Sequence, residues 1–197
     1  MPFTKYALDE LYSQNISQLT ECSAPEVVKY FSQSEHWVAN FFLNSVFGCP
    51  IDQNGRAFSF AYLRRAETAF LEYEIARKFL VDFINSNHER PSLYLKSLTH
   101  FEVTITMVYQ AYQLLMRISE EKLFQNNDGS LLERLHKIYN LIRHFNPFEL
   151  PSKHFHAMWI TNDGLQIENC SLSFQELKEI MIEIGEFADR VSEIRKK

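Results

Sequence analysis

The sequence predicts an all-α fold: an up-and-down helical bundle of five to six helices, with one small β-hairpin near residues 155–168. Long stretches carry apolar residues at alternating three- and four-residue steps, the spacing of a helix that buries one stripe. Three Ser-x-x-Glu capping boxes, beginning at Ser23, Ser130 and Ser173, mark helix starts. The chain has five Gly and six Pro in 197 residues, so turns are few and elements long. We expect a single helical-bundle domain over residues 1–197, because a chain of this length buries a sizeable core.

The first half of the chain predicts three helices. Apolar residues at helical spacing indicate a helix over residues 3–19. The capping box at Ser23 opens a second helix, which runs to about residue 47, before a Gly-Cys-Pro stop. Residues 51–56 are predicted to form a turn. A long helix over residues 58–84 follows, and its alternating apolar seam is typical of a helix packed lengthwise on its neighbours.

The second half predicts a central helix, the hairpin and a final amphipathic helix. Ser92 is expected to cap a long helix with two apolar sides, which places this helix at the centre of the bundle. A helix over residues 130–145 follows an Asn-Asn-Asp-Gly turn. Asp163-Gly164 lies between two short apolar segments and is a two-residue hairpin turn signal. Ser173 caps the last helix, which carries a clean apolar stripe.

Composition and cysteine spacing indicate a cytoplasmic protein. Cys22, Cys49 and Cys170 are widely spaced and form no CxxC pair, so we expect neither a disulfide framework nor a zinc knuckle. The first residues lack the basic start and apolar run of a signal peptide, and no uncharged apolar stretch is long enough to span a membrane. The formal net charge of −5 gives no global attraction to nucleic acid, although a local basic patch can still bind it.

The histidines and acidic residues do not form a recognisable metal site. Glu133 and His136 make one Glu-x-x-His pair, whereas a di-iron bundle needs a second pair and two further carboxylates. A di-metal oxidoreductase is therefore a remote alternative, and these two residues are expected on a solvated face. His154 and His156 flank Phe155 and are interpreted as the polar face of a strand rather than as metal ligands. We expect no metal and no organic cofactor.

Several arginines lie on the long helix over residues 58–84. Arg77 falls one step from the apolar seam, so an internal ion pair is favoured over a site for a ligand phosphate. Arg64 and Arg65 are spread among glutamates on the same helix.

The helix over residues 130–145 carries the candidate site. Its buried stripe is predicted to be Leu131, Leu135, Ile138, Ile142 and Phe145. Asn140 and His144, four residues apart, share a different face, and Arg143 is adjacent. Imidazole titrates near neutral pH and guanidinium matches phosphate, so these three side chains can perform general acid/base chemistry on a phosphodiester.

The segment Tyr139-Asn-Leu-Ile-Arg-His144 resembles the motif of the HEPN superfamily, an arginine and a polar residue followed by three residues and a histidine. It matches at Asn140 and His144, and Tyr139 stands where the family has its catalytic arginine. The last 60 or so residues also resemble a group of bacterial helical proteins in which an R-N-x-x-K-H-F segment precedes a Trp-x-Thr-x-Asp-Gly hairpin. The resemblance implies a metal-independent RNase or a toxin–antitoxin or phage-defence component. The tyrosine implies weak activity or an inactive relative.

Two functions remain open from the sequence. One is a HEPN-like, RNA-directed protein, active or degenerate, with Asn140, Arg143 and His144 as catalytic residues. The other is a non-enzymatic helical bundle that binds a protein partner, in which Asn140 and His144 only tie their helix to the loop over residues 146–160. HEPN-type sites commonly form where two protomers meet, so the resemblance also implies a homodimer.

Overall fold

The computed structural model describes residues 9–10, 16–46, 53–119, 124–143, 158–167 and 170–193. Within these ranges the predicted fold class is confirmed, since α-helices dominate and a small antiparallel sheet accompanies them. The elements are the 3-10 turns η1 (Ile16–Gln18) and η2 (Val28–Tyr30), the helices α2 (Trp37–Val46), α3 (Gln53–Asn85), α4 (Pro91–Ser119), α5 (Leu131–Arg143) and α6 (Phe174–Ser192), and the strands β1 (Met158–Ile160), β2 (Gly164–Ile167) and β3 (Cys170–Ser173).

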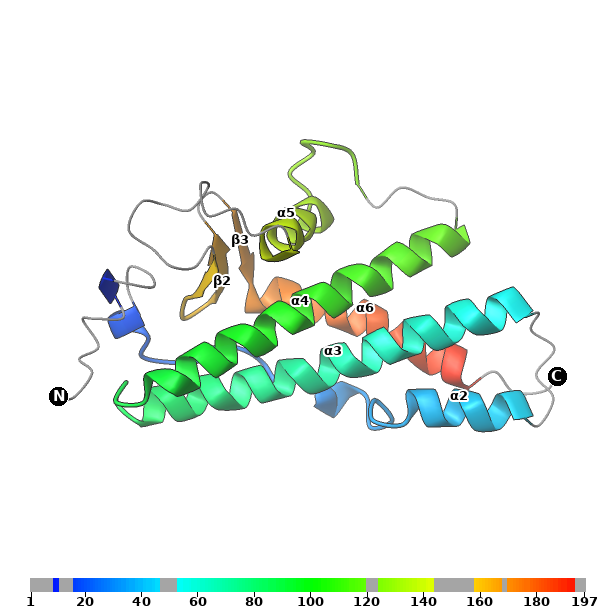
Figure 1. Cartoon of the computed structure of the whole chain (residues 1–197), viewed down its shortest axis with the longest axis horizontal. Helices are drawn as coiled ribbons and strands as arrows, with labels where there is room; N and C mark the ends of the chain where they lie inside the picture. The colour runs from blue at the N-terminus through cyan, green and yellow to red at the C-terminus, as the bar shows by residue number, and fades with distance from the viewer. Residues whose placement is uncertain are drawn as a thin grey trace.

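The two long helices α3 and α4 run antiparallel along the length of the molecule, and α6 packs against both of them (Figure 1). Buried aromatic rings join these three helices. The ring of Tyr73 on α3 lies 6.0 Å from that of Phe101 on α4, which in turn lies 5.3 Å from the ring of Phe174 on α6. Each such pair adds about 0.5–1.5 kcal/mol to the burial of its apolar area. None of the helices within the described ranges has the length and apolar character needed to cross a bilayer.

The helix expected from Ser23 to about residue 47 is instead a 3-10 turn, η2, followed by the shorter helix α2. Carboxylates on α3 explain the break. Glu74 accepts hydrogen bonds from the backbone N–H groups of Val27 and Val28, at 3.0 and 3.4 Å, and Glu67 accepts one from Val38 at 3.0 Å. These backbone groups are therefore satisfied by another helix, and a continuous helix is not required to pair them.

The capping box predicted at Ser23 does not form, because both of its side chains have other partners. The Ser23 hydroxyl donates to the carbonyl oxygen of Asn162 at 2.7 Å, and Glu26 forms an ion pair with Arg77 at 3.1 Å. The amide oxygen of Asn162 also lies 3.1 Å from the backbone nitrogen of Thr20. The tip of the hairpin thus fastens the segment that precedes η2.

Helix α2 is anchored to the C-terminal helix. The indole N–H of Trp37 donates to Asp189, and the Asn44 side chain donates to the carbonyl oxygen of Ser192 at 2.6 Å. The predicted helix over residues 3–19 lies mostly outside the described residues. Within them, residues 9–10 are helical and residues 16–18 form η1.

Helix α3 begins at Gln53, so part of the turn predicted over residues 51–56 is helical. A single glycine, Gly55, in the first turn costs only about 1 kcal/mol and does not stop a helix. Helix α4 begins at Pro91, one residue before the predicted cap at Ser92. Proline suits the first helical position, where its missing N–H has no intrahelical partner to lose.

The predicted hairpin near residues 155–168 is part of a three-stranded antiparallel sheet in the order β1-β2-β3. Residues 155–157 and 168 lie outside the described residues. The third strand was missed because its last residue, Ser173, is also the cap of α6, and the sequence analysis assigned this segment to the start of that helix.

The tip of the hairpin consists of Asn162 and Asp163, not of the predicted Asp163-Gly164 pair. The backbone nitrogen of Thr161 bonds to the carbonyl oxygen of Gly164 at 2.8 Å and closes a two-residue loop between them. Glycine is required at position 164 for space. An added Cβ would lie 2.3 Å from the carbonyl oxygen of Leu172 on the neighbouring strand.

The capping box at the start of α6 is confirmed. Ser173 accepts a hydrogen bond from the backbone of Glu176 at 3.1 Å, and the Glu176 carboxylate accepts one from the backbone of Ser173 at 2.9 Å. Further along α6, Gly185 lets the ring of Phe31 approach closely, since a Cβ at this position would lie 2.6 Å from the ring.

Candidate functional site

Helix α5 is held at its start by a buried carboxylate. The Glu133 side chain is 3% exposed and accepts hydrogen bonds from the backbone N–H groups of Asn127 at 2.6 Å and Gly129 at 2.7 Å. The Gly129 bond is the main cause of the lowered pKa of Glu133. Ser130 accepts from the backbone of Glu133 at 3.2 Å, so half of the predicted capping box forms. The expectation that Glu133 lies on a solvated face was wrong, because the residue caps the preceding loop.

His136 is also engaged by its neighbours. Its Nε2 is hydrogen-bonded to the amide nitrogen of Asn140 at 2.9 Å, and its ring packs between those of Tyr109 and Phe124, with centroids 5.2 and 5.1 Å away. Burial lowers the pKa of His136 and so favours the neutral imidazole. Across the described ranges, no group of three or more His, Cys, Asp or Glu side chains is arranged to hold a metal ion.

The structure separates two of the predicted catalytic residues. Asn140 is half-buried and points to His136, whereas Arg143, one turn further on, donates from Nη1 to the hydroxyl of Tyr139 at 3.1 Å. His144 lies outside the described residues, as do His154 and His156.

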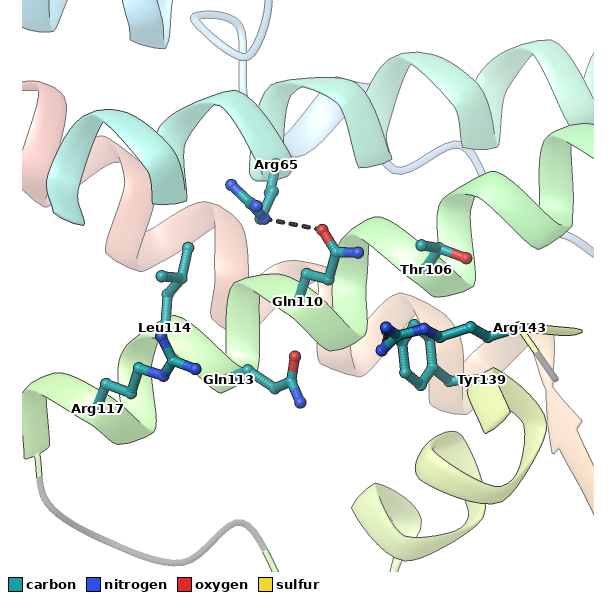
Figure 2. A pocket seen from close by; sticks show the side chains of 8 residues that line it. All are labelled: Arg65, Thr106, Gln110, Gln113, Leu114, Arg117, Tyr139 and Arg143. Carbon is teal, nitrogen blue, oxygen red and sulfur yellow. Dashed lines mark hydrogen bonds between the residues drawn. The ribbon is translucent and has the colours of Figure 1, made fainter. Parts of the chain in front are cut away.

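A cavity of about 500 Å³ lies between α3, α4 and α5 (Figure 2). Each of these helices contributes one arginine to its lining: Arg65, Arg117 and Arg143. The other lining residues are Thr106, Gln110, Gln113, Leu114 and Tyr139. We call this cavity the arginine pocket. Its described lining residues supply three guanidinium groups and no carboxylate.

Two of the pocket's side chains are fixed by contacts within the fold. Arg65 donates from Nε to the side-chain oxygen of Gln110 and from Nη1 to the carbonyl oxygen of Ala61, both at 2.9 Å. The Tyr139 ring lies 4.4 Å from that of Tyr109 and is 5% exposed, so the hydroxyl that receives Arg143 is rigidly placed. In Figure 2, Arg117 and Arg143 reach toward the pocket from opposite ends, with the two glutamines between them.

Among the described residues, no carboxylate pairs with the arginines of the pocket. Within the described ranges, none of the three guanidinium groups forms a salt bridge, whereas Arg77 pairs with Glu26 and Arg134 with Glu176. Arg77 thus forms an ion pair as predicted, but the expectation that the pair is internal was wrong, because the Glu26 side chain is 56% exposed. Three like charges that share one cavity repel each other, and a bound anion removes that repulsion. Guanidinium forks match the geometry of phosphate.

A second cavity, of about 710 Å³, lies beside η2 and the middle of α3 and is less suited to a ligand. Four of its charged lining groups already serve the fold. Glu67 and Glu74 accept backbone hydrogen bonds, and Arg77 pairs with Glu26.

Sequence analysis overlooked the contribution of α4 to the arginine pocket. Its polar lining residues Thr106, Gln110, Gln113 and Arg117 follow each other at steps of four, three and four. This spacing places them on one side of a helix whose other sides are apolar. A polar stripe on a helix predicted to be central was the signal that indicated a site.

Comparison with known proteins identifies no relative of this chain. The chain matches no protein-family model, no curated protein and no solved structure. The functional assignment therefore rests on the chemistry of the arginine pocket and the neighbouring face of α5.

Proposed function

We propose that this protein is a HEPN-like, RNA-directed protein of a defence or toxin–antitoxin system, with weak RNase activity or none. RNA contacts the arginine pocket and the C-terminal end of α5. His144 is the general acid or base, and Arg143 binds the phosphate. Asn140, which the sequence predicts on the same helix face as His144, orients the phosphate or the imidazole.

The position of Arg143 is the observation that carries the proposal. Tyr139 occupies the place of the arginine in the HEPN motif, but the Arg143 guanidinium lies 3.1 Å from the Tyr139 hydroxyl at the same pocket. Arg143, one helical turn further on, thus places a positive charge next to Tyr139, the position of the motif arginine. Arg65 and Arg117 add the electrostatic attraction that an RNA backbone requires.

The proposal is tested first by binding. Fluorescence anisotropy of a labelled single-stranded RNA should show an affinity that falls with salt. If three phosphates are neutralised, the slope of log K against log salt is about −2, from roughly −0.7 per phosphate on single strands. Folded protein that binds no single-stranded RNA at low salt would contradict the proposal.

Cleavage is tested separately, without added metal and with a chelator. Wild-type protein should cleave RNA weakly or not at all, because the motif arginine is missing. Tyr139→Arg should raise cleavage, and adding His144→Ala should abolish the gain, since a positioned proton-transfer group supplies about 10²–10⁴-fold in rate. Tyr139 is buried, so the circular dichroism and melting temperature of each variant are measured alongside. Folded Tyr139→Arg protein without activity would favour the non-enzymatic alternative.

The exposed surface of α2 favours the second candidate, a helical bundle that binds a protein partner. Phe42, Leu43 and Val46 share one side of α2 and are 63%, 53% and 65% exposed. Large apolar side chains gathered on a helix surface are typical of protein–protein contacts. The partner proposed here is a second copy of this chain. The HEPN resemblance implies a different contact, in which the α5 face that carries Asn140 lies near the two-fold axis.

A further inference from the structure

We propose that the arginine pocket binds a phosphate monoester, the terminal phosphate of an RNA chain. This inference rests on the proposed function, because it names the part of the RNA that enters the pocket. It concerns recognition of an RNA end and does not require cleavage.

The first argument is the number of charges. The pocket presents three guanidinium groups, from Arg65, Arg117 and Arg143, in a protein whose formal net charge is −5. An internal phosphodiester carries a single negative charge, whereas a terminal monoester carries about −1.5 to −2 near pH 7. The monoester therefore balances more of the pocket's charge, and it also offers more acceptor oxygens to the three guanidinium groups.

The second argument is that two of the three arginines, Arg65 and Arg143, are held in place before a ligand arrives. Arg65 is fixed through Nε and Nη1, both at 2.9 Å from their acceptors, so its remaining N–H groups are available. Arg143 is held by Tyr139, whose hydroxyl accepts from Nη1 and can donate its own hydrogen to a phosphate oxygen. Side chains that are already ordered lose little entropy on binding, so more of the interaction energy appears as affinity.

The third argument is size. The pocket volume of about 500 Å³ lies within the roughly 300–1,000 Å³ range of small-molecule sites. It is therefore larger than a bare phosphate needs. Gln113 and Leu114 provide a polar amide and an apolar surface beside the arginines, which suit the sugar and base of a terminal nucleotide. The ligand class is thus a nucleotide that ends in a phosphate, and an RNA end and a free mononucleotide share this chemistry.

Matched oligonucleotides test the inference with the full chain. One single-stranded RNA sequence is prepared with hydroxyl ends, with a 5′-phosphate and with a 3′-phosphate, and each form is titrated by anisotropy. We expect one phosphorylated form to bind at least about tenfold more tightly than the hydroxyl-ended form, and AMP to compete for the pocket more strongly than inorganic phosphate. Equal affinity of all three forms overturns the inference but leaves RNA binding by the proposed function intact. Tight binding of AMP with no binding of RNA has the opposite meaning: the monoester site stands, and the proposed function fails.

Variants locate the effect. Arg65→Gln, Arg117→Gln and Arg143→Gln should each reduce the preference for a phosphorylated end at least threefold. Arg64→Gln is the charge-matched control, because Arg64 is the exposed neighbour of Arg65 on α3 and does not line the pocket. Equal loss in Arg64→Gln and the pocket variants would overturn the assignment to this pocket.

A pH series needs no variant. Arginines stay charged throughout, whereas a monoester takes up a proton as the pH falls through about 6. The preference for a phosphorylated end should therefore decline between pH 7 and pH 5. A preference that is constant over this range contradicts recognition of the dianion.

Discussion

The Tyr139 hydroxyl is expected to act through Arg143. Replacement Tyr139→Phe keeps the ring that stacks 4.4 Å from Tyr109 but removes the acceptor 3.1 Å from the Arg143 guanidinium. We expect a loss of about 0.5–1.5 kcal/mol in the free energy of unfolding and a several-fold weaker affinity for RNA. Urea denaturation and anisotropy measure the two effects.

Tyr30→Phe is the control for this substitution, because Tyr30 is 49% exposed and lies away from the arginine pocket. Tyr30→Phe should change neither the free energy of unfolding nor the affinity for RNA. Unchanged RNA affinity in Tyr139→Phe would show that the hydroxyl does not position Arg143.

A second residue-scale prediction concerns pH. The pKa of Glu176 is lowered from its ordinary value of 4.5, mainly by the hydrogen bond from Arg134 and further by the bonds from Ser173. A lowered pKa in the native state means that this carboxylate stabilises the fold above pH 4.5 and loses that effect as the pH falls further. Glu176→Gln should therefore lower the melting temperature at pH 7 and differ little from wild type at pH 3.

Glu186→Gln, on the exposed side of the same helix, is the control and should follow wild type at both pH values. A Glu176→Gln deficit of equal size at pH 7 and pH 3 would mean that the charge of this carboxylate contributes nothing.

At the scale of elements, the carboxylates of α3 determine the path of the chain before α2. Replacement Glu74→Ala leaves the backbone N–H groups of Val27 and Val28 without their acceptor, and Val27 is fully buried. We expect a loss of about 1–3 kcal/mol in the free energy of unfolding. Hydrogen exchange of the Val27 and Val28 amides should accelerate more than that of α4. Glu74→Gln keeps an acceptor oxygen and should retain most of the stability, so equal losses in both variants would contradict the explanation.

The close contact between α6 and Phe31 gives a prediction with a clear sign. Alanine exceeds glycine in helix propensity by about 1 kcal/mol, so Gly185→Ala would stabilise an unobstructed helix. Here the new Cβ would lie 2.6 Å from the Phe31 ring, and overpacking costs about 1–3 kcal/mol. Thermal denaturation should show that Gly185→Ala lowers the melting temperature. When Gly185→Ala is combined with Phe31→Leu, the loss should be smaller than the sum of the losses in the two single variants. A stabilised Gly185→Ala protein would mean that the ring moves freely.

Sequence analysis predicted elements correctly where the determining contacts are local. The capping box of α6 joins residues three apart, Ser173 and Glu176, and it was recognised from the sequence. The segment that became η2 and α2 was misassigned because its backbone partners, Glu67 and Glu74, lie 29 and 47 residues away. No pattern within the segment reveals those partners.

The candidate site was likewise predicted only where its residues lie close together in the sequence. The sequence drew attention to Arg143 and to the tyrosine at the motif position, because they share one helix. Arg65 and Arg117 reach the pocket only through the packing of α3, α4 and α5, so the sequence alone did not join them to Arg143. Whether Asn140 and His144 act on RNA stays a prediction.

For the whole molecule, we predict a homodimer at micromolar concentration. The exposed residues Phe42, Leu43 and Val46 of α2 provide the apolar surface, and closed two-fold dimers are the commonest oligomers. Light scattering should give the dimer mass, and Phe42→Glu should shift it to the monomer without loss of helical signal. A wild-type monomer would contradict the prediction. A dimer that resists Phe42→Glu but separates with Arg143→Glu would move the interface to the α5 face.

The bonds that tie α2 to α6 have a consequence for biosynthesis. Trp37 and Asn44 reach their partners Asp189 and Ser192 across 152 and 148 residues of chain. At a translation rate of about 5–20 residues per second, roughly 8–30 s separate the synthesis of α2 from that of α6, which packs on it. The helical hairpin of α3 and α4 can form during this interval, but the indole of Trp37 remains without its final contacts. We therefore expect a chain that ends before α6 to expose this apolar segment and to aggregate more readily than the full chain.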